Sequence, residues 1–134
     1  MSLTPQDESA LAQGRAFQWH ELCVPDLDAA IKFYCEALGF GTAEMDMGPA
    51  GIYRMLTREG RPICGLQSTL VPPAEGQPPH WATYLWVDDV DARLEKSLAL
   101  GAKLVVPATD VPTVGRMAMI QDPQGANIWL FKGA

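Results

Sequence analysis

The sequence predicts an α+β fold built from two tandem βαβββ modules. Three observations point to it: a helix-entry pattern that occurs twice, alternating apolar runs after each helix, and a proline-rich segment between the halves. The length of 134 residues suits one domain with its own core. We expect a tail over 1–14 and one domain over 15–134, with module one at 15–69, a linker at 70–79 and module two at 80–133.

Each module is expected to begin with a strand that leads into a capped helix. The segments WHELCVPDLDAAIKFYCEALGF and ATYLWVDDVDARLEKSLALGA both end a strand pattern at a valine. An aspartate that can cap a helix follows, Asp26 or Asp89, and a glycine, Gly39 or Gly101, ends the helix. Apolar residues recur between them at helical spacing and predict the buried stripes, which are Leu27, Ile31, Tyr34 and Leu38, then Val90, Leu94 and Leu98.

Three short runs with strand character follow each helix. They cover 41–47, 51–57 and 62–69 in the first module and 103–107, 116–121 and 127–132 in the second, where the turn DPQG joins the last two. The linker VPPAEGQPP can form neither a helix nor a central strand, because proline lacks the backbone N–H that both need.

Composition and charge exclude several classes of function. A net charge of −6 argues against a nucleic-acid partner, because such proteins concentrate lysine and arginine. No apolar run approaches the ~20 residues that cross a membrane. The N-terminal residues lack the pattern of a secretory signal. The three cysteines, Cys23, Cys35 and Cys64, form no paired motif, so we expect reduced thiols and a cytoplasmic location.

The two helix-entry segments, with IQDPQGANIWLFK near the end, resemble the vicinal oxygen chelate superfamily. This superfamily includes glyoxalase I, extradiol dioxygenases and bleomycin-resistance proteins. The resemblance runs from about Phe17 to Lys132. It implies a curled, barrel-like mixed sheet with the helices outside, a ligand cavity enclosed by the modules, and a homodimer. For metal-dependent members it also implies four ligand positions on the inner face, in the first and last strands of each module.

The residues at those four positions predict that the usual metal site is absent. Indole offers only an N–H donor and alanine offers no ligand atom, so no cofactor is expected. A displaced metal site that uses His80 and Glu21 stays open as an alternative. Counted along this sequence, the four positions hold Trp19, Cys64, Ala82 and Trp129.

Strand alternation predicts which side chains face the interior. Leu22 and Val24 suit the face under the helix, which leaves Trp19 and Glu21 on the other face. The lining suits a planar or cationic molecule through stacking and cation–π contacts, although the same rings could simply fill the interior. The candidate ligand-binding residues are Trp19, Glu21, Tyr53, Tyr84, Trp86, Met117, Met119 and Trp129.

The sequence therefore favours a metal-independent protein that binds a small aromatic or cationic molecule. One alternative is a lyase, isomerase or dioxygenase-like enzyme that uses a non-standard metal site or Glu21 as acid or base. Another is a non-catalytic dimerising module. A backbone amide, a tyrosine hydroxyl, Arg54 or Arg116 could equally satisfy the Glu21 carboxylate. The expected partners are a small molecule and a second copy of the chain, with no nucleic acid and no membrane.

Overall fold

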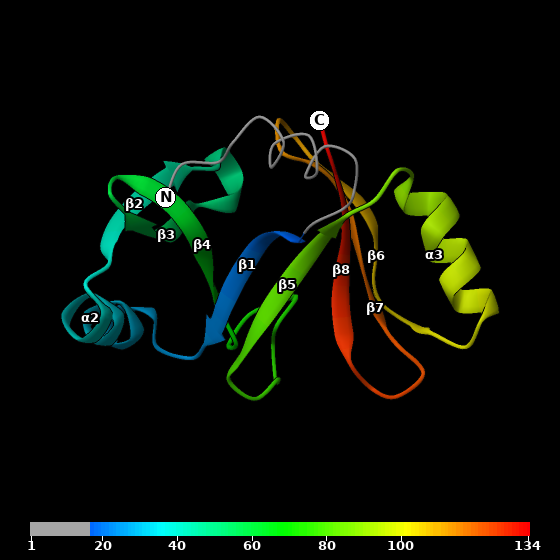
Figure 1. The fold of residues 1–134 in the computed structure, drawn as a ribbon, viewed down its shortest axis with the longest axis horizontal. Coiled ribbons are helices and arrows are strands. Elements are labelled where there is room, and N and C mark those ends of the chain that lie inside the picture. The colour runs from blue at the N-terminus through cyan, green and yellow to red at the C-terminus, as the bar shows by residue number, and fades with distance from the viewer. Residues whose placement is uncertain (1–16) are drawn as a thin grey trace. The chain divides into compact units, whose positions relative to one another are not determined.

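The computed structural model describes residues 17–134, so the predicted tail lies outside the described residues. Within them the chain divides into two compact units. The first unit comprises residues 19–82, and the second comprises residues 83–134 with residues 17 and 18. Strands and helices follow the predicted βαβββ order twice, which confirms the α+β class (Figure 1).

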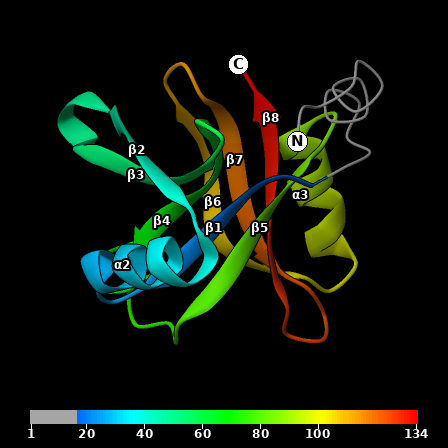
Figure 2. The ribbon, with the colours of Figure 1, turned by 60° about the vertical axis from the view of Figure 1, so that its left-hand side comes forward.

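The first unit is a four-stranded mixed sheet with one helix. Its strand order is β2-β3-β4-β1, in which β1 runs parallel to β4 and the other neighbours are antiparallel (Figure 2). A short 3-10 turn, Gly48–Ala50, connects β2 to β3. The elements are β1 (Phe17–Val24), α2 (Leu27–Leu38), β2 (Gly41–Asp46), β3 (Ile52–Arg58) and β4 (Arg61–Ser68).

The second unit repeats this topology. Its strand order is β5-β8-β7-β6, with β5 parallel to β8 and the other neighbours antiparallel. The parallel pair joins the first and last strands of the repeat, as it does in the first unit. The elements are β5 (His80–Trp86, the first three residues of which belong to the first unit), α3 (Val90–Ala99), β6 (Lys103–Val111), β7 (Gly115–Gln121) and β8 (Asn127–Gly133).

Both helices begin at the predicted caps. The Asp26 carboxylate accepts a hydrogen bond from the Ala29 backbone N–H at 3.0 Å, and Asp89 accepts from Ala92 at 3.0 Å. Helix α2 ends at Gly39, whose φ of 73° is the left-handed conformation that glycine adopts at least cost. Helix α3 ends at Ala99, slightly before the glycine that was expected to stop it.

Each helix packs on one face of its own sheet. In the first unit the buried cluster comprises Leu22, Leu56, Cys64 and Leu66, and in the second it comprises Val90, Ala118, Ile120 and Leu130. The predicted stripes pack against these clusters except at their last members. Leu38 is 51% exposed and Leu98 is 39% exposed, so the final turn of each helix leaves the core.

Strand β6 is longer than predicted. The sequence pattern stopped at Pro107, whereas the strand continues to Val111. Two register shifts on either side of Val106 accommodate the proline in the β6–β7 ladder. Because β6 is the last strand in the order of its unit, the missing N–H of proline is tolerated there.

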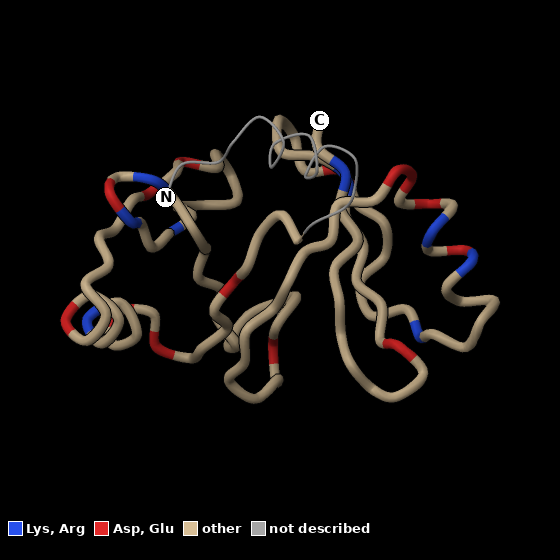
Figure 3. Tube along the Cα trace, viewed as in Figure 1, with Lys and Arg blue, Asp and Glu red and all other residues tan. Residues whose placement is uncertain are grey.

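Charged residues occupy exposed positions of α3 and its entry. Acidic residues come first, and basic and acidic residues alternate further along the helix (Figure 3). Arg93 Nε lies 2.8 Å from an oxygen of Asp88, in an exposed pair that contributes little to stability. No helix within residues 17–134 has both the length and the apolar character needed to span a membrane.

Candidate functional site

Trp19, Glu21 and Tyr53 form a hydrogen-bonded group, here called the polar triad. The Tyr53 hydroxyl donates to Glu21 Oε2 at 2.6 Å, and Trp19 Nε1 donates to the Tyr53 oxygen at 2.9 Å. Glu21 is only 6% exposed, whereas both aromatic residues are half-buried. Since Leu22 packs under α2, alternation places the triad on the opposite face of the sheet. The short charge-assisted bond offsets part of the cost of burying a carboxylate.

The two arginines considered as partners for Glu21 are paired with aspartates. Arg54 Nη1 lies 2.6 Å from Asp28 Oδ1 on helix α2, and Arg116 is bonded to two aspartates of the second unit. Among the partners that the sequence analysis considered for Glu21, the structure shows a tyrosine hydroxyl, that of Tyr53.

Gly65 leaves the space that the Tyr53 ring fills. It pairs with Glu21 in the parallel β1–β4 ladder, and a Cβ built at Gly65 would overlap the hydroxyl and ring of Tyr53. Sequence reasoning missed this residue. The available signal was a glycine inside a strand pattern, which often marks a close approach of another group.

The assignment of Cys64 to the inner face is wrong. Cys64 is buried in the cluster under α2, and the inner position belongs to Gly65. The first strands of the two units align Glu21 with Tyr84, whereas the last strands align Gly65 with Trp129. The number of residues between equivalent positions of the two units is therefore larger by one in the last strands than in the first strands. Aligning the last strands by sequence alone missed this extra residue and selected Cys64 in place of Gly65.

The four positions implied for metal ligands do not fit a metal. They hold Trp19, Gly65, Ala82 and Trp129, which together offer no carboxylate, imidazole or thiolate. His80 Nδ1 lies 2.7 Å from the backbone carbonyl oxygen of Pro78. Within the described part of the chain, His, Cys, Asp and Glu side chains form no group of three that could hold a metal ion.

The second unit carries four aromatic rings on the sheet face opposite α3, here called the aromatic wall. Tyr84 and Trp129 are stacked, with ring centroids 5.1 Å apart and planes 5° from parallel. Phe131 meets Tyr84 and Trp86 nearly edge-on, at 6.4 and 5.6 Å. Trp86 is half-buried, whereas the other three rings are buried. Phe131 was not among the predicted ligand-binding residues.

Two methionines extend the aromatic wall along β7. Met117 pairs with Phe131 and Met119 pairs with Trp129 in the antiparallel β7–β8 ladder. Met119 is buried and Met117 is half-buried. The predicted ligand-binding residues thus fall into two groups, the polar triad and the aromatic wall with its methionines, each within one unit.

Burial raises the pKa of two thiols and one phenol in the first unit. It raises the pKa of the Cys23 thiol to about 11, and the charge of Glu21 adds to this shift. Burial also raises the pKa of the Tyr53 phenol, again with the help of Glu21. The pKa of Cys64 is raised mainly by burial. At neutral pH these thiols are therefore poor nucleophiles.

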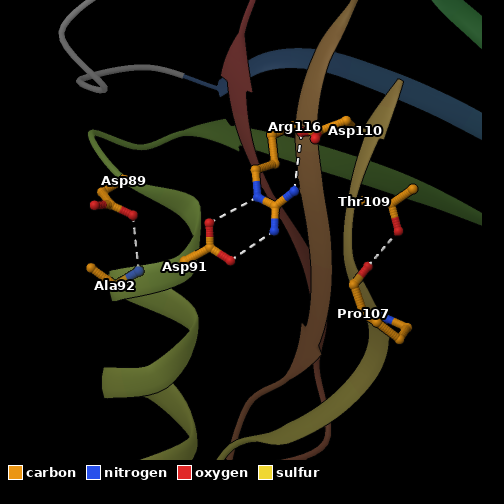
Figure 4. Close-up of polar contacts among 7 residues, drawn as sticks. All are labelled: Asp89, Asp91, Ala92, Pro107, Thr109, Asp110 and Arg116. Atoms are coloured by element: carbon orange, nitrogen blue, oxygen red, sulfur yellow. Dashed lines mark hydrogen bonds and ion pairs between the residues drawn. The ribbon is translucent and has the colours of Figure 1, made fainter. Parts of the chain in front are cut away.

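An open pocket of about 390 Å³ lies beside the N-terminus of α3. Arg116 fixes one side of it, with 2.8 and 2.9 Å bonds to the Asp91 carboxylate and a 3.1 Å bond to Asp110 (Figure 4). These bonds raise the pKa of the guanidinium and lower the pKa of Asp91. Because the Arg116 guanidinium bonds to a carboxylate on α3 and to another on β6, we interpret this group as a brace between α3, β6 and β7.

Comparison with known proteins agrees with this architecture. Residues 16–130 match the model of the Glyoxalase/Bleomycin resistance protein/Dioxygenase superfamily. The chain belongs to this superfamily. The superfamily match confirms the resemblance seen in the helix-entry segments.

Three similar proteins illustrate the range of relatives. "Putative glyoxylase CFP32" of Mycobacterium tuberculosis is 37% identical over 115 residues, which cover 85% of this chain and 44% of that protein. "Anthracycline biosynthesis protein DnrV" of Streptomyces peucetius is 26% identical, over 81% of this chain and 43% of the relative. The chain thus spans less than half the length of these curated relatives. The crystal structure of methylmalonyl-CoA epimerase from M. tuberculosis aligns with a TM-score of 0.62 at 23% identity, over 92% of this chain and 91% of the epimerase, which supports the fold.

Proposed function

We propose that the chain is a binding domain that holds a small planar aromatic molecule, neutral or cationic, against its aromatic wall. The wall itself carries this proposal. Helix α3 is covered by aliphatic residues on the other face of the sheet, so the rings are not needed to pack the helix. Aromatic pairs contribute about 0.5–1.5 kcal/mol each beyond the area they bury, and a cation over an indole gains a similar amount.

The half-buried Trp86 of the wall and the half-buried Met117 next to the wall on β7 are the proposed contact points for the ligand. Trp86 lies across β8, where a Cβ at Gly133 would come within 2.5 Å of its ring. This support holds the indole in one orientation, so little rotamer freedom is lost on binding. Met117, which pairs with Phe131 from the other side of β8, can adapt to the shape of a ligand.

We further propose that binding requires no metal, because the four implied ligand positions supply no suitable donor. A relative named for anthracycline biosynthesis agrees with a planar aromatic ligand. That relative is more than twice as long as the matched region, so only the class of ligand is carried over to this chain.

Titration calorimetry with daunorubicin, a planar aromatic cation, tests the proposal. We expect binding by metal-free protein and an affinity at least about tenfold lower in Trp86→Ala. Anthraquinone-2-sulfonate, an anionic planar ring, separates the contribution of stacking from that of charge.

Trp81→Ala is the matched control for this experiment. Trp81 lies on the same strand but is 50% exposed and contacts Tyr34 of α2 edge-on at 5.7 Å. Its removal should leave the affinity unchanged. Equal losses in both variants, or no binding of either probe, would contradict a binding role for the wall.

The polar triad favours a second candidate function, acid–base catalysis by Glu21. A buried carboxylate with a phenol at 2.6 Å is a fixed pair that can exchange a proton with a bound substrate. One relative is named as a glyoxylase, so methylglyoxal with glutathione is a suitable first substrate to test. Turnover that is lost in Glu21→Gln and kept in Glu95→Gln would support catalysis, whereas no turnover in the native chain removes this substrate class.

The homodimer also remains a proposal. Exposed apolar side chains such as Phe33, 60% exposed, offer surface for association. Light scattering at several protein concentrations measures the mass directly. A mass of one chain at all concentrations would contradict the homodimer and the dimerising-module alternative together.

A further inference from the structure

We infer that the first unit contains a phenol-binding site that is occupied by the chain's own Tyr53. The Tyr53 oxygen accepts from Trp19 Nε1 at 2.9 Å and donates to Glu21 Oε2 at 2.6 Å. A hydroxyl is a group that can accept one hydrogen bond and donate another through a single atom. The two partners therefore satisfy both capacities of a phenol oxygen.

The ring of Tyr53 also has a place prepared for it. Gly65 lies beneath it, and a side chain there would overlap the ring. The two hydrogen-bonding partners, Trp19 and Glu21, lie on β1, and Gly65, which leaves space for the ring, lies on β4. Tyr53 itself lies on β3. The receptor for the phenol is thus built by strands other than the one that supplies it.

The chemistry of the site selects phenols over other aromatic molecules. An aryl ether can accept from Trp19 but cannot donate to Glu21, which leaves a buried carboxylate without that bond. An aromatic acid would place its negative charge against the Glu21 carboxylate. A neutral aromatic hydroxyl makes both bonds without either penalty.

The second unit lacks such a site at the equivalent positions. Met117 stands at the position of Tyr53 in the repeat, and Trp129 stands at that of Gly65. Tyr84 replaces the carboxylate of Glu21. Met117→Ala therefore opens space of similar location without the acceptor, and serves as the matched control.

The test removes the built-in phenol and supplies one from solution. We expect Tyr53→Ala to bind p-cresol at least about tenfold more tightly than 4-methylanisole, because only p-cresol donates to the carboxylate. The melting temperature of the variant should rise with p-cresol concentration in a saturable way. Native protein should show no preference between the two molecules, because Tyr53 fills the site, and Met117→Ala should show none either.

The indole N–H resonance of Trp19 locates the bound molecule. In the nitrogen–proton spectrum it should shift when p-cresol is added to Tyr53→Ala and stay in place in native protein, with Trp19→Phe identifying the resonance. If Tyr53→Ala fails to fold alone, folding that p-cresol restores and 4-methylanisole does not restore gives the same answer. Equal affinity of Tyr53→Ala for the two molecules, each read from the Trp19 resonance, would overturn the inference. A Trp19 resonance that p-cresol never shifts in this variant would also overturn it. Because Trp19 is the reporter, binding of either molecule at the aromatic wall does not enter these two outcomes.

Discussion

The two units share one topology but differ in the side chains on the sheet face opposite the helix. In the first unit the first-strand residue Glu21 is covered by a tyrosine ring that bonds to it, and in the second the equivalent Tyr84 is covered by a stacked indole. One face became a polar network and the other an aromatic wall. In each unit one large ring covers the side chain at this position of the first strand, Glu21 or Tyr84. The contact is a hydrogen bond in the first unit and ring stacking in the second.

The covering ring comes from a different strand in each unit. In the first unit β3 supplies Tyr53 and β4 supplies Gly65, whereas in the second β7 supplies Met117 and β8 supplies Trp129. The large ring therefore stands on β3 in the first unit and on β8 in the second. The residue on the neighbouring strand is a glycine in the first unit and a flexible methionine in the second. Close packing explains the coupling, because two large rings would need the same space.

Replacing Gly65 and Tyr53 by their equivalents in the second unit should have the largest effect on the free energy of unfolding. Gly65→Trp alone should destabilise the protein by about 3 kcal/mol, because the indole and the Tyr53 ring would overlap. Adding Tyr53→Met copies the second unit and should recover about half of that loss. Urea unfolding of the single and double variants measures the coupling. Simple additivity of the two changes would show that positions 53 and 65 do not share one ring-sized space.

Removal of the phenol oxygen comes next in size. Tyr53→Phe should cost about 1.5–3 kcal/mol at neutral pH, because Glu21 loses a charge-assisted hydrogen bond while it stays buried. The equivalent change in the second unit, Met117→Leu, conserves volume and should cost less than about 1.5 kcal/mol. Thermal unfolding compares them, and equal costs would mean that the hydroxyl contributes nothing beyond packing.

The helix caps should respond alike and moderately. Asp26→Ala and Asp89→Ala should each destabilise by about 1 kcal/mol, since each carboxylate accepts one N–H at 3.0 Å. Denaturant midpoints measured in parallel give the difference between the two caps. A gap well above about 1 kcal/mol would break the equivalence of the helix starts.

The change with the smallest effect at neutral pH should alter stability only in alkaline solution. Because the pKa of Cys23 is raised to about 11 from 9.0, the folded state holds this proton more tightly than the unfolded state. Its contribution is fully present below pH 9.0 and is lost as the pH rises towards about 11. Cys23→Ala should flatten this part of the stability curve relative to that of the native protein. A native curve without any decline in that window would argue against the shift.

Much of the fold could be predicted because its signals are local. Asp26 and Gly39 act within one turn of their own helix, and the alternation of Leu22 and Val24 depends only on neighbouring residues. These features determined the repeat, the fold class and the face that carries Glu21. The superfamily resemblance rests on the same short segments.

Tertiary structure decided what depends on residues from several strands. The order of the sheet placed Pro107 inside an edge strand, and the β1–β4 register put Gly65, rather than Cys64, beside Glu21. Register between distant strands follows from bulges and turns, which period-two patterns do not reveal. The sequence by itself determined that Glu21 shares a face with aromatic residues. Only the folded chain decided that Tyr53 reaches it, because the space for that ring is a gap left on another strand.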